Sequence, residues 1–152
     1  MEQRWVFTIK SQDRAGVLTA ATAVFSHRGV SLETIFGGGG TLVEVESGRF
    51  VLCFRATQRK QELLLRTLER LASVEQVAVH PYSSSQVRAI AIVRLAEAIE
   101  FERDGVQVDR IDSGSPERIL LLSGSTSAIE QLIATFKSQN VLLDAAVSIV
   151  AV

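Results

Sequence analysis

The segment best suited to hold a small anion is a loop between a predicted strand and a predicted helix. It consists of Asp13, Arg14, Ala15, Gly16, Val17 and Leu18. Backbone N–H groups at the start of a helix point in the same direction and lack intrahelical acceptors. Together with the helix dipole they attract a carboxylate. Gly16 would let a ligand approach the backbone closely, and Asp13 could cap the helix or meet an ammonium group. Taken alone, the pattern is more typical of a capped helix start than of a binding site.

The thiol and imidazole groups have simpler explanations than catalysis. Cys53 lies between Leu52 and Phe54 with no base nearby in sequence, which is typical of a buried, small apolar residue. His27 is expected at a helix C-terminus, where a cation suits the helix dipole, and His80 precedes a linker. One cysteine and two histidines cannot build a metal site. We therefore expect no catalytic residues, no bound metal and no cofactor.

Two further clusters resemble sites for a metal ion and for a phosphate. The acidic residues of the first cluster are Glu97, Glu100, Glu102, Asp104, Asp109 and Asp112. Arg103 and Arg110 are interleaved with them, which favours a solvated face over a metal cage. The serine-rich stretch that ends at Ser127 is followed by Glu130, and this spacing predicts a capping box at a helix start. An enzyme that uses the acidic residues is the least favoured alternative.

Composition and charge exclude several classes of protein. With 152 residues, 47% of them hydrophobic and 22% charged, the chain can bury a core and does not resemble a disordered protein. The formal net charge of -1 gives no long-range attraction for nucleic acid or anionic lipid, so neither is expected as a partner. The N-terminus does not resemble a signal peptide, no apolar run approaches about 20 residues, and the single cysteine suits a reducing compartment. We expect a cytoplasmic location.

Apolar periodicity in the first half predicts the order βαββαβ. The predicted elements are a strand Trp5–Lys10, a helix from Val17 to Gly29, extended segments Val30–Phe36 and Leu42–Glu46 with Phe50–Phe54 as their antiparallel partner, a helix Gln58–Ala72 and a strand Val77–Val79. Ser47 and Gly48 are expected to form a tight connection within a hairpin. Gly37–Gly40 is expected to be a flexible bulge or loop, since no Lys-Ser/Thr follows it as in a phosphate cradle.

A linker-like stretch, His80–Ser85, separates this half from a similar second half, which predicts domains at residues 1–82 and 83–152. The predicted elements of the second half are strands Val87–Leu95 and Ile119–Leu122, a helix Ala128–Lys137 and a strand Val141–Val150. The intervening Ala96–Asp104 is too short for a full helix and its turns, so the first helix of this domain is expected to be short or absent. Alternatively, Asp104 and Gly105 turn a hairpin between residues 99–101 and 106–108.

The repeated order predicts an α+β fold of two ferredoxin-like domains. Each domain is expected to form a four-stranded antiparallel sheet with its helices on one face. The other face of the first sheet is not polar, because Phe50, Leu52 and Phe54 alternate with Val51 and Cys53 along one strand. We expect a second chain to cover that face.

A further pattern extends across the first predicted helix. Gly16-Val17-Leu18 is followed by Phe25, by Arg28-Gly29 and then by Ser31-Leu32-Glu33-Thr34. In its order and spacing this segment resembles the ACT domain, in particular that of acetolactate synthase small (regulatory) subunits. The resemblance is strong over residues 4 to about 57 and extends to Tyr82. In the second half only the order of strands and helices is similar.

The resemblance implies two ACT-type domains and a homodimer, or a larger homo-oligomer, whose sheets join side by side. It also implies that an amino acid such as valine binds between the loop of one chain and the helix-to-strand junction of the other. The positions carried over are Asp13, Arg14, Ala15, Gly16, Val17, Leu18, Ser31 and Leu32. The family usually has asparagine in place of Asp13 and of Ser31, so the polar contacts with the ligand differ.

These expectations favour a non-catalytic regulatory protein over an enzyme. Such a protein would bind an amino-acid effector at a dimer interface and control a metabolic enzyme, for example the catalytic subunit of an acetolactate synthase in branched-chain amino acid biosynthesis. The alternative is a structural or assembly module that keeps the fold and the oligomer but has lost the ligand. The changes at Asp13 and Ser31 would allow that loss.

Overall fold

The computed structural model describes residues 1–12, 15–38, 47–111 and 114–152, which divide into two compact units. Unit 1 comprises Met1–Ser84 and Ala151–Val152, and unit 2 comprises Ser85–Val150. The elements of unit 1 are β1 (Gln3–Gln12), α1 (Val17–His27), β2 (Leu32–Gly38), β3 (Ser47–Ala56), α2 (Gln58–Glu69) and β4 (Val74–Pro81). Those of unit 2 are β5 (Arg88–Leu95), β6 (Gln107–Ile111), β7 (Arg118–Ser125), α3 (Thr126–Ser138) and β8 (Leu142–Val150).

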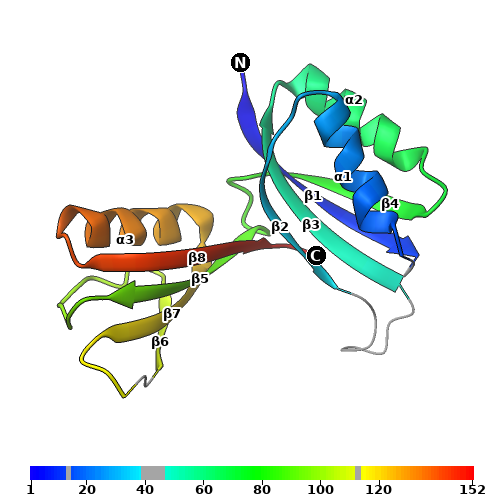
Figure 1. Ribbon diagram of the computed structural model, residues 1–152. Helices are drawn as coiled ribbons and strands as arrows, with labels where there is room; N and C mark the ends of the chain where they lie inside the picture. Colours follow the sequence, from blue (N-terminus) through cyan, green and yellow to red (C-terminus); the bar gives the residue numbers. More distant parts are fainter. Residues whose placement is uncertain (13–14, 39–46, 112–113) are drawn as a thin grey trace. The chain divides into compact units, whose positions relative to one another are not determined.

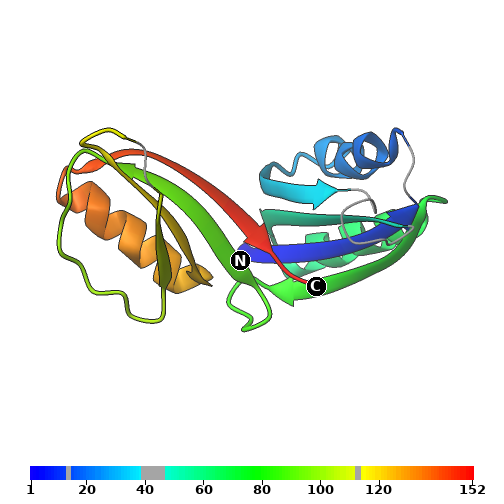
Figure 2. The same ribbon diagram turned by 90° about the horizontal axis from the view of Figure 1, so that it is seen from below.

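Unit 1 is an antiparallel sheet with the strand order β2-β3-β1-β4 (Figure 2). Helices α1 and α2 lie on one face of it (Figure 1). Strand β3 pairs antiparallel with both β1 and β2, so β1 and β2 run in the same direction. This is the predicted βαββαβ order, and it leaves β2 and β4 as the edges of the sheet.

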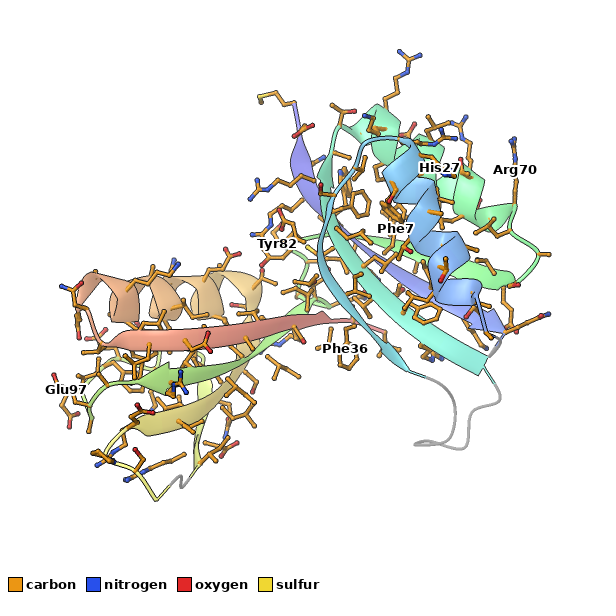
Figure 3. All side chains as sticks on the ribbon, viewed as in Figure 1. Phe7, His27, Phe36, Arg70, Tyr82 and Glu97 are labelled. Atoms are coloured by element: carbon orange, nitrogen blue, oxygen red, sulfur yellow. The ribbon has the colours of Figure 1, made fainter. Side chains whose placement is uncertain are left out.

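The core of unit 1 forms between the sheet and the two helices. The rings of Phe7, Phe25 and Phe54 meet edge to face, with centroids 4.8 to 6.1 Å apart. Phe7 lies between the strands and the helices in Figure 3. Helix α2 contributes Leu64 and Leu68, both fully buried. Burial of such side chains stabilises the fold by roughly 1.5–3 kcal/mol each, so this cluster fixes α1 and α2 on the sheet.

Unit 2 repeats this arrangement without the first helix. Its antiparallel sheet has the order β6-β7-β5-β8, and α3 lies along one face (Figure 1). Between β5 and β6 the described residues contain no helix, and the ring of Phe101 packs edge to face on Phe136 of α3 at 5.1 Å. The chain turns at Gly105 with a φ of +79°, but residues 99–101 form no strand. The alternative hairpin prediction is therefore wrong, and the helix is absent rather than short.

Two local predictions in unit 1 need correction. Gly37 and Gly38 belong to β2, where they lie opposite Phe50 and Arg49 of β3. A Cβ on Gly37 would come within 2.6 Å of the Arg49 carbonyl oxygen, so the strands approach too closely there for any side chain. Ser47 and Gly48 start β3 instead of forming a turn. Gly39, Gly40 and the strand predicted at 42–46 lie outside the described residues.

The face of the first sheet opposite the helices is less bare than the sequence suggests. Val51 and Cys53 are 5% and 0% exposed within the single chain, so these two residues need no second chain to bury them. The expectation that a second chain covers this face stays a prediction. Glu33 lies beside Cys53, with Oε2 3.9 Å from the Cys53 Sγ, and its carboxylate accepts hydrogen bonds from Arg4 Nε at 2.8 Å and Arg55 Nε at 2.7 Å. No helix among the described residues has the length and apolarity needed to cross a membrane.

Candidate functional site

The first half of the candidate site is the N-terminus of α1. Gly16 is the N-cap, and the first intrahelical bond runs from Ala20 N–H to the Gly16 carbonyl oxygen at 2.9 Å. The N–H groups of residues 17–19 therefore have no acceptor within the helix, as an anion site requires. Val17 is buried, whereas Ala15, Gly16 and Leu18 are exposed. Asp13 and Arg14 lie outside the described residues.

Gly16 is required here by its backbone conformation. Its φ is +85°, in the left-handed region that favours glycine. A Cβ built on Gly16 would meet no atom within 4 Å. The space above Gly16 is therefore open, and a ligand could reach the backbone without displacing a described side chain.

The second half of the candidate site is the junction between α1 and β2. Helix α1 ends as Val30 N–H donates to the Phe25 carbonyl oxygen at 3.0 Å, with Gly29 at a φ of +67°. Ser31 is exposed, and Leu32 is partly buried against the core. A hollow of about 490 Å³ lies beside this junction, lined by Thr22, Phe25, Ser26, Gly29, Val30, Ser31 and Leu32. It is large enough for the side chain of a small amino acid.

Two side chains of α2 hold the junction in place. Arg28 Nη2 donates to Thr67 Oγ1 at 3.0 Å, and Lys60 Nζ donates to the Arg28 carbonyl oxygen at 3.3 Å. The second bond satisfies a carbonyl group at the end of α1 and places a cation at the negative end of the helix dipole. Neither Lys60 nor Thr67 was predicted from the sequence as part of the site. Lys60 and Thr67 are seven residues apart, which places them on one face of α2. This spacing is the only feature of the sequence that points to a shared role for the two residues.

The two halves of the site do not meet within one chain. They lie at opposite ends of α1, whose 11 residues make a helix about 16 Å long. The structure thus separates Ala15–Leu18 from Ser31 and Leu32 by more than an amino acid can span. If these residues form one site, it must be completed by a second copy.

An exposed edge lies next to the junction. Strand β2 follows Ser31 directly and is an edge of the sheet. Ile35 and Phe36 on this strand are 50% and 47% exposed. In the register with β3, Phe36 lies opposite Val51, on the face away from the helices, and Figure 3 shows its side chain projecting from β2. Large apolar side chains on a free edge strand favour pairing with another chain.

The environment of Cys53 makes it inert. Burial, and secondly the negative charge of Glu33, raise the pKa of the thiol from 9.0 to about 11. The thiol donates a weak hydrogen bond to Glu33 Oε2 at 3.9 Å. A nucleophile would need a lowered pKa and access to solvent. The predicted role of Cys53 as a buried small residue is confirmed.

The acidic cluster does not assemble into a metal site in the part of the chain that the structure describes. No group of three His, Cys, Asp or Glu side chains there could hold a metal ion. Glu102 and Asp104 instead line a second hollow, of about 390 Å³, between residues 101–106 and α3. Asp112 lies outside the described residues.

Comparison with known proteins identifies the fold. No family model matches the sequence, and no curated protein matches it. The acetolactate synthase small subunit from Thermotoga maritima has a TM-score of 0.75 at 19% identity, over 99% of this chain and 96% of that chain. The regulatory subunit of aspartate kinase from Thermus thermophilus has a TM-score of 0.49 at 14% identity, over 88% of this chain and 93% of that chain. The ACT domain of GTP pyrophosphokinase from Chlorobium tepidum has a TM-score of 0.45 at 18% identity, covering 53% of this chain and 100% of that chain. This chain therefore has the fold of a two-domain ACT protein and resembles the acetolactate synthase small subunit in structure.

Proposed function

We propose that the protein is a non-catalytic regulatory homodimer that binds an amino acid at a site shared between its two chains. The observation that carries this proposal is the position of the two half-sites at opposite ends of α1, next to an exposed sheet edge. Each half alone is incomplete. A second copy supplies the missing half when the β2 edges pair.

The sheet topology supports such an arrangement. Because β1 and β2 run in the same direction, the end of β2 at Gly38 lies at the same end of the sheet as Gln12, where the chain leaves for α1. Antiparallel pairing of two β2 strands sets the start of one strand against the end of the other. Leu32 of one copy would then lie near Gly38 of the other, at the end of the sheet that carries Gly16. Two equivalent sites follow from the two-fold symmetry.

The chemistry of the two halves suits an α-amino acid with an aliphatic side chain. The free N–H groups at the start of α1 and the helix dipole favour its carboxylate. The hollow at the junction, with Phe25, Val30 and Leu32 in its lining, suits an apolar side chain of valine-like size. We propose that Ser31 and Asp13 supply the remaining polar contacts with the ligand, Asp13 with its ammonium group.

A ligand held by both chains regulates by changing how those chains pack. It stabilises whichever arrangement brings the half-sites together, so any partner that binds the two arrangements differently responds to it. We propose that this partner is the catalytic subunit of an amino-acid biosynthetic enzyme. The structural similarity to an acetolactate synthase small subunit makes that enzyme the first to test.

Thermal unfolding with each common amino acid in turn tests the proposal. A ligand at about 100 times its Kd stabilises the folded state by about 2.7 kcal/mol, which raises the Tm of a chain of this size by roughly 5 °C or more. We expect this shift from an aliphatic amino acid and none from its D-enantiomer, which serves as the matched control. If no amino acid raises the Tm, the protein is better described as an assembly module without a ligand.

A further inference from the structure

The free edges of the two sheets differ in how well they are protected. Natural proteins shield an edge strand by making it short or by placing charged residues or proline on it. Strand β4 carries Glu75 and Pro81, and β6 has five residues that include Asp109 and Arg110. The proposed dimer uses the β2 edge. One edge, β8, is left without a function.

Strand β8 is long and largely apolar for an edge. It runs for nine residues, Leu142–Val150, with Asp144 as its one charged residue. Residues 143–147 are all exposed, with Leu143 at 49% and Val147 at 39%. An exposed edge of this kind is a template for another strand.

The backbone shows which residues of β8 face the free side. Ala145 N–H donates to the carboxylate of Asp144 at 2.9 Å, so it points away from β5. Along an antiparallel strand the N–H and C=O of one residue point to the same side and alternate residues point oppositely. Ala145, Val147 and Ile149 therefore present their backbone groups to the free edge. The register with β5 shifts between Arg94 and Leu95, so the regular part of β8 starts at Asp144.

We propose that β8 pairs antiparallel with β8 of a second copy, in a register centred on Val147. In this register Ala145 lies opposite Ile149 of the second copy, and Val147 lies opposite its own counterpart, so every outward backbone group meets another. Asp144 lies opposite Val150 rather than another Asp144, which avoids a repulsive pair. Pairing about a two-fold axis needs a surface that complements itself, and residues 144–150 of β8 form such a surface. Two four-stranded sheets would join into one of eight strands.

Asp144 limits the strength of this pairing. Its carboxylate already satisfies the Ala145 N–H, which must be released before Ile149 of the second copy can accept that hydrogen bond. The Asp144→Ala variant should therefore associate more strongly than the natural chain. A dilution series followed by light scattering would show the larger assembly surviving to lower concentration, and earlier dissociation than the natural chain would contradict the proposed register.

The mass of the protein in solution, measured by size exclusion with light scattering, tests the pairing itself. Val147→Glu places two like charges on the two-fold axis and should lower the mass at least two-fold. Ile111→Glu is the matched control, since Ile111 is 40% exposed on the β6 edge of the same unit, and it should leave the mass unchanged. An unchanged mass for a folded Val147→Glu chain, judged by circular dichroism, would overturn the proposal.

A mixing experiment separates pairing from damage to the fold. Val147→Lys alone should also lower the mass, because it again sets like charges opposite each other. An equal mixture of the Val147→Glu and Val147→Lys chains should recover the larger mass as mixed pairs, since each Glu then meets a Lys. If the substitutions only destabilised unit 2, mixing the two chains would not restore the larger mass. Failure of two folded variants to recover the mass when mixed would contradict the register.

The β8 pairing does not depend on the proposed β2 pairing, and either can fail while the other holds. The β8 partner in this proposal is a copy other than the β2 partner, so with both interfaces intact the proposed β2 dimers join into assemblies of at least four chains. A Phe36→Glu chain, blocked at β2, should remain a dimer through β8 and become a monomer when Val147→Glu is added. A Phe36→Glu chain that is already monomeric would overturn the β8 pairing, and a Val147→Glu chain that is already monomeric would overturn the β2 pairing.

Discussion

Gly16 is the residue on which the proposed site depends most directly. Its positive φ and the open space above it let α1 begin with free N–H groups exposed to a ligand. A side chain there would fill that space and also strain the backbone, since the left-handed region costs other residues about 1–2 kcal/mol. The two effects can be separated, because only the first concerns binding.

We predict that Gly16→Val abolishes amino-acid binding while the dimer persists. Gly105→Val is the control, because Gly105 has a similar φ of +79° and equally open surroundings in unit 2. Both variants should lose about 1–2 kcal/mol of stability from backbone strain, measured by urea unfolding. Only Gly16→Val should abolish the heat of binding in calorimetry. Equal binding by both variants would show that the ligand does not approach Gly16.

Cys53 gives a prediction about pH. Its thiol pKa is raised from 9.0 to about 11, so between these values the folded state keeps a proton that the unfolded state has lost. The free energy of unfolding should therefore fall as the pH rises from about 9 to about 11, by at most about 1.4 kcal/mol per pH unit, with no contribution below that window. Urea unfolding of the natural chain and of Cys53→Ala across this range isolates the effect. A difference between the two chains that stays constant with pH would contradict the raised pKa.

The residues of the candidate site were only partly predictable from sequence. The position of Gly16 followed from the change in apolar period at Val17, which marks a helix start. Lys60 and Thr67 were not found, because their contacts with Arg28 and its carbonyl group depend on how α2 packs against α1. Periodicity describes one element at a time and carries no information about such contacts.

At the scale of elements, the start of α3 shows why caps are hard to place. Ser125, Thr126 and Ser127 are all suited to capping, and the position of Glu130 predicts Ser127 as the cap, since the two have the spacing of a capping box. The structure corrects this by two residues: β7 runs to Ser125, whose hydroxyl accepts a hydrogen bond from Ala128 N–H at 3.2 Å. The strand passes directly into the helix, and a local pattern could not reveal that.

Ser125→Ala should lower the stability of the protein by about 1 kcal/mol, because the Ala128 N–H loses its acceptor. Ser127→Ala is the control and should change the stability by less than about 0.5 kcal/mol, since Ser127 is an exposed residue inside the helix. Thermal or urea unfolding of both variants measures the difference. A larger loss for Ser127→Ala would place the cap where the sequence pattern suggested.

The β2 edge makes a prediction that links association to binding. Phe36→Glu puts a charge on this edge and should both halve the mass in solution and abolish amino-acid binding, because each site needs both chains. Leu63→Glu is the control: Leu63 is 44% exposed on α2, against 47% for Phe36, and is not on a sheet edge. Light scattering and calorimetry on the same samples check both effects. A Phe36→Glu chain of half the mass that still binds would show that the site lies within one chain.

At the scale of the whole molecule, the repeat of strands and helices predicted the architecture well. Two antiparallel sheets, one with two helices and one with a single helix on one face, follow from alternating and helical periods that persist along the chain. The missing helix of unit 2 was left open because Ala96–Asp104 is compatible with several short structures. The segment between β5 and β6 takes its conformation from tertiary packing, through the contact of Phe101 with Phe136 of α3.

The claim that one amino-acid site is built from two chains can be tested by complementation. Gly16→Val damages the loop half, and Ser31→Trp fills the junction half. Each variant alone should fail to bind the amino acid that stabilises the natural protein. When the two are mixed and allowed to exchange chains, half of the dimers carry one site with both defects and one intact site, so about a quarter of the natural binding capacity should return. Calorimetric titration of the mixture measures it. Recovery of that fraction would establish a shared site, whereas a mixture of exchanged, folded dimers that binds nothing would contradict it.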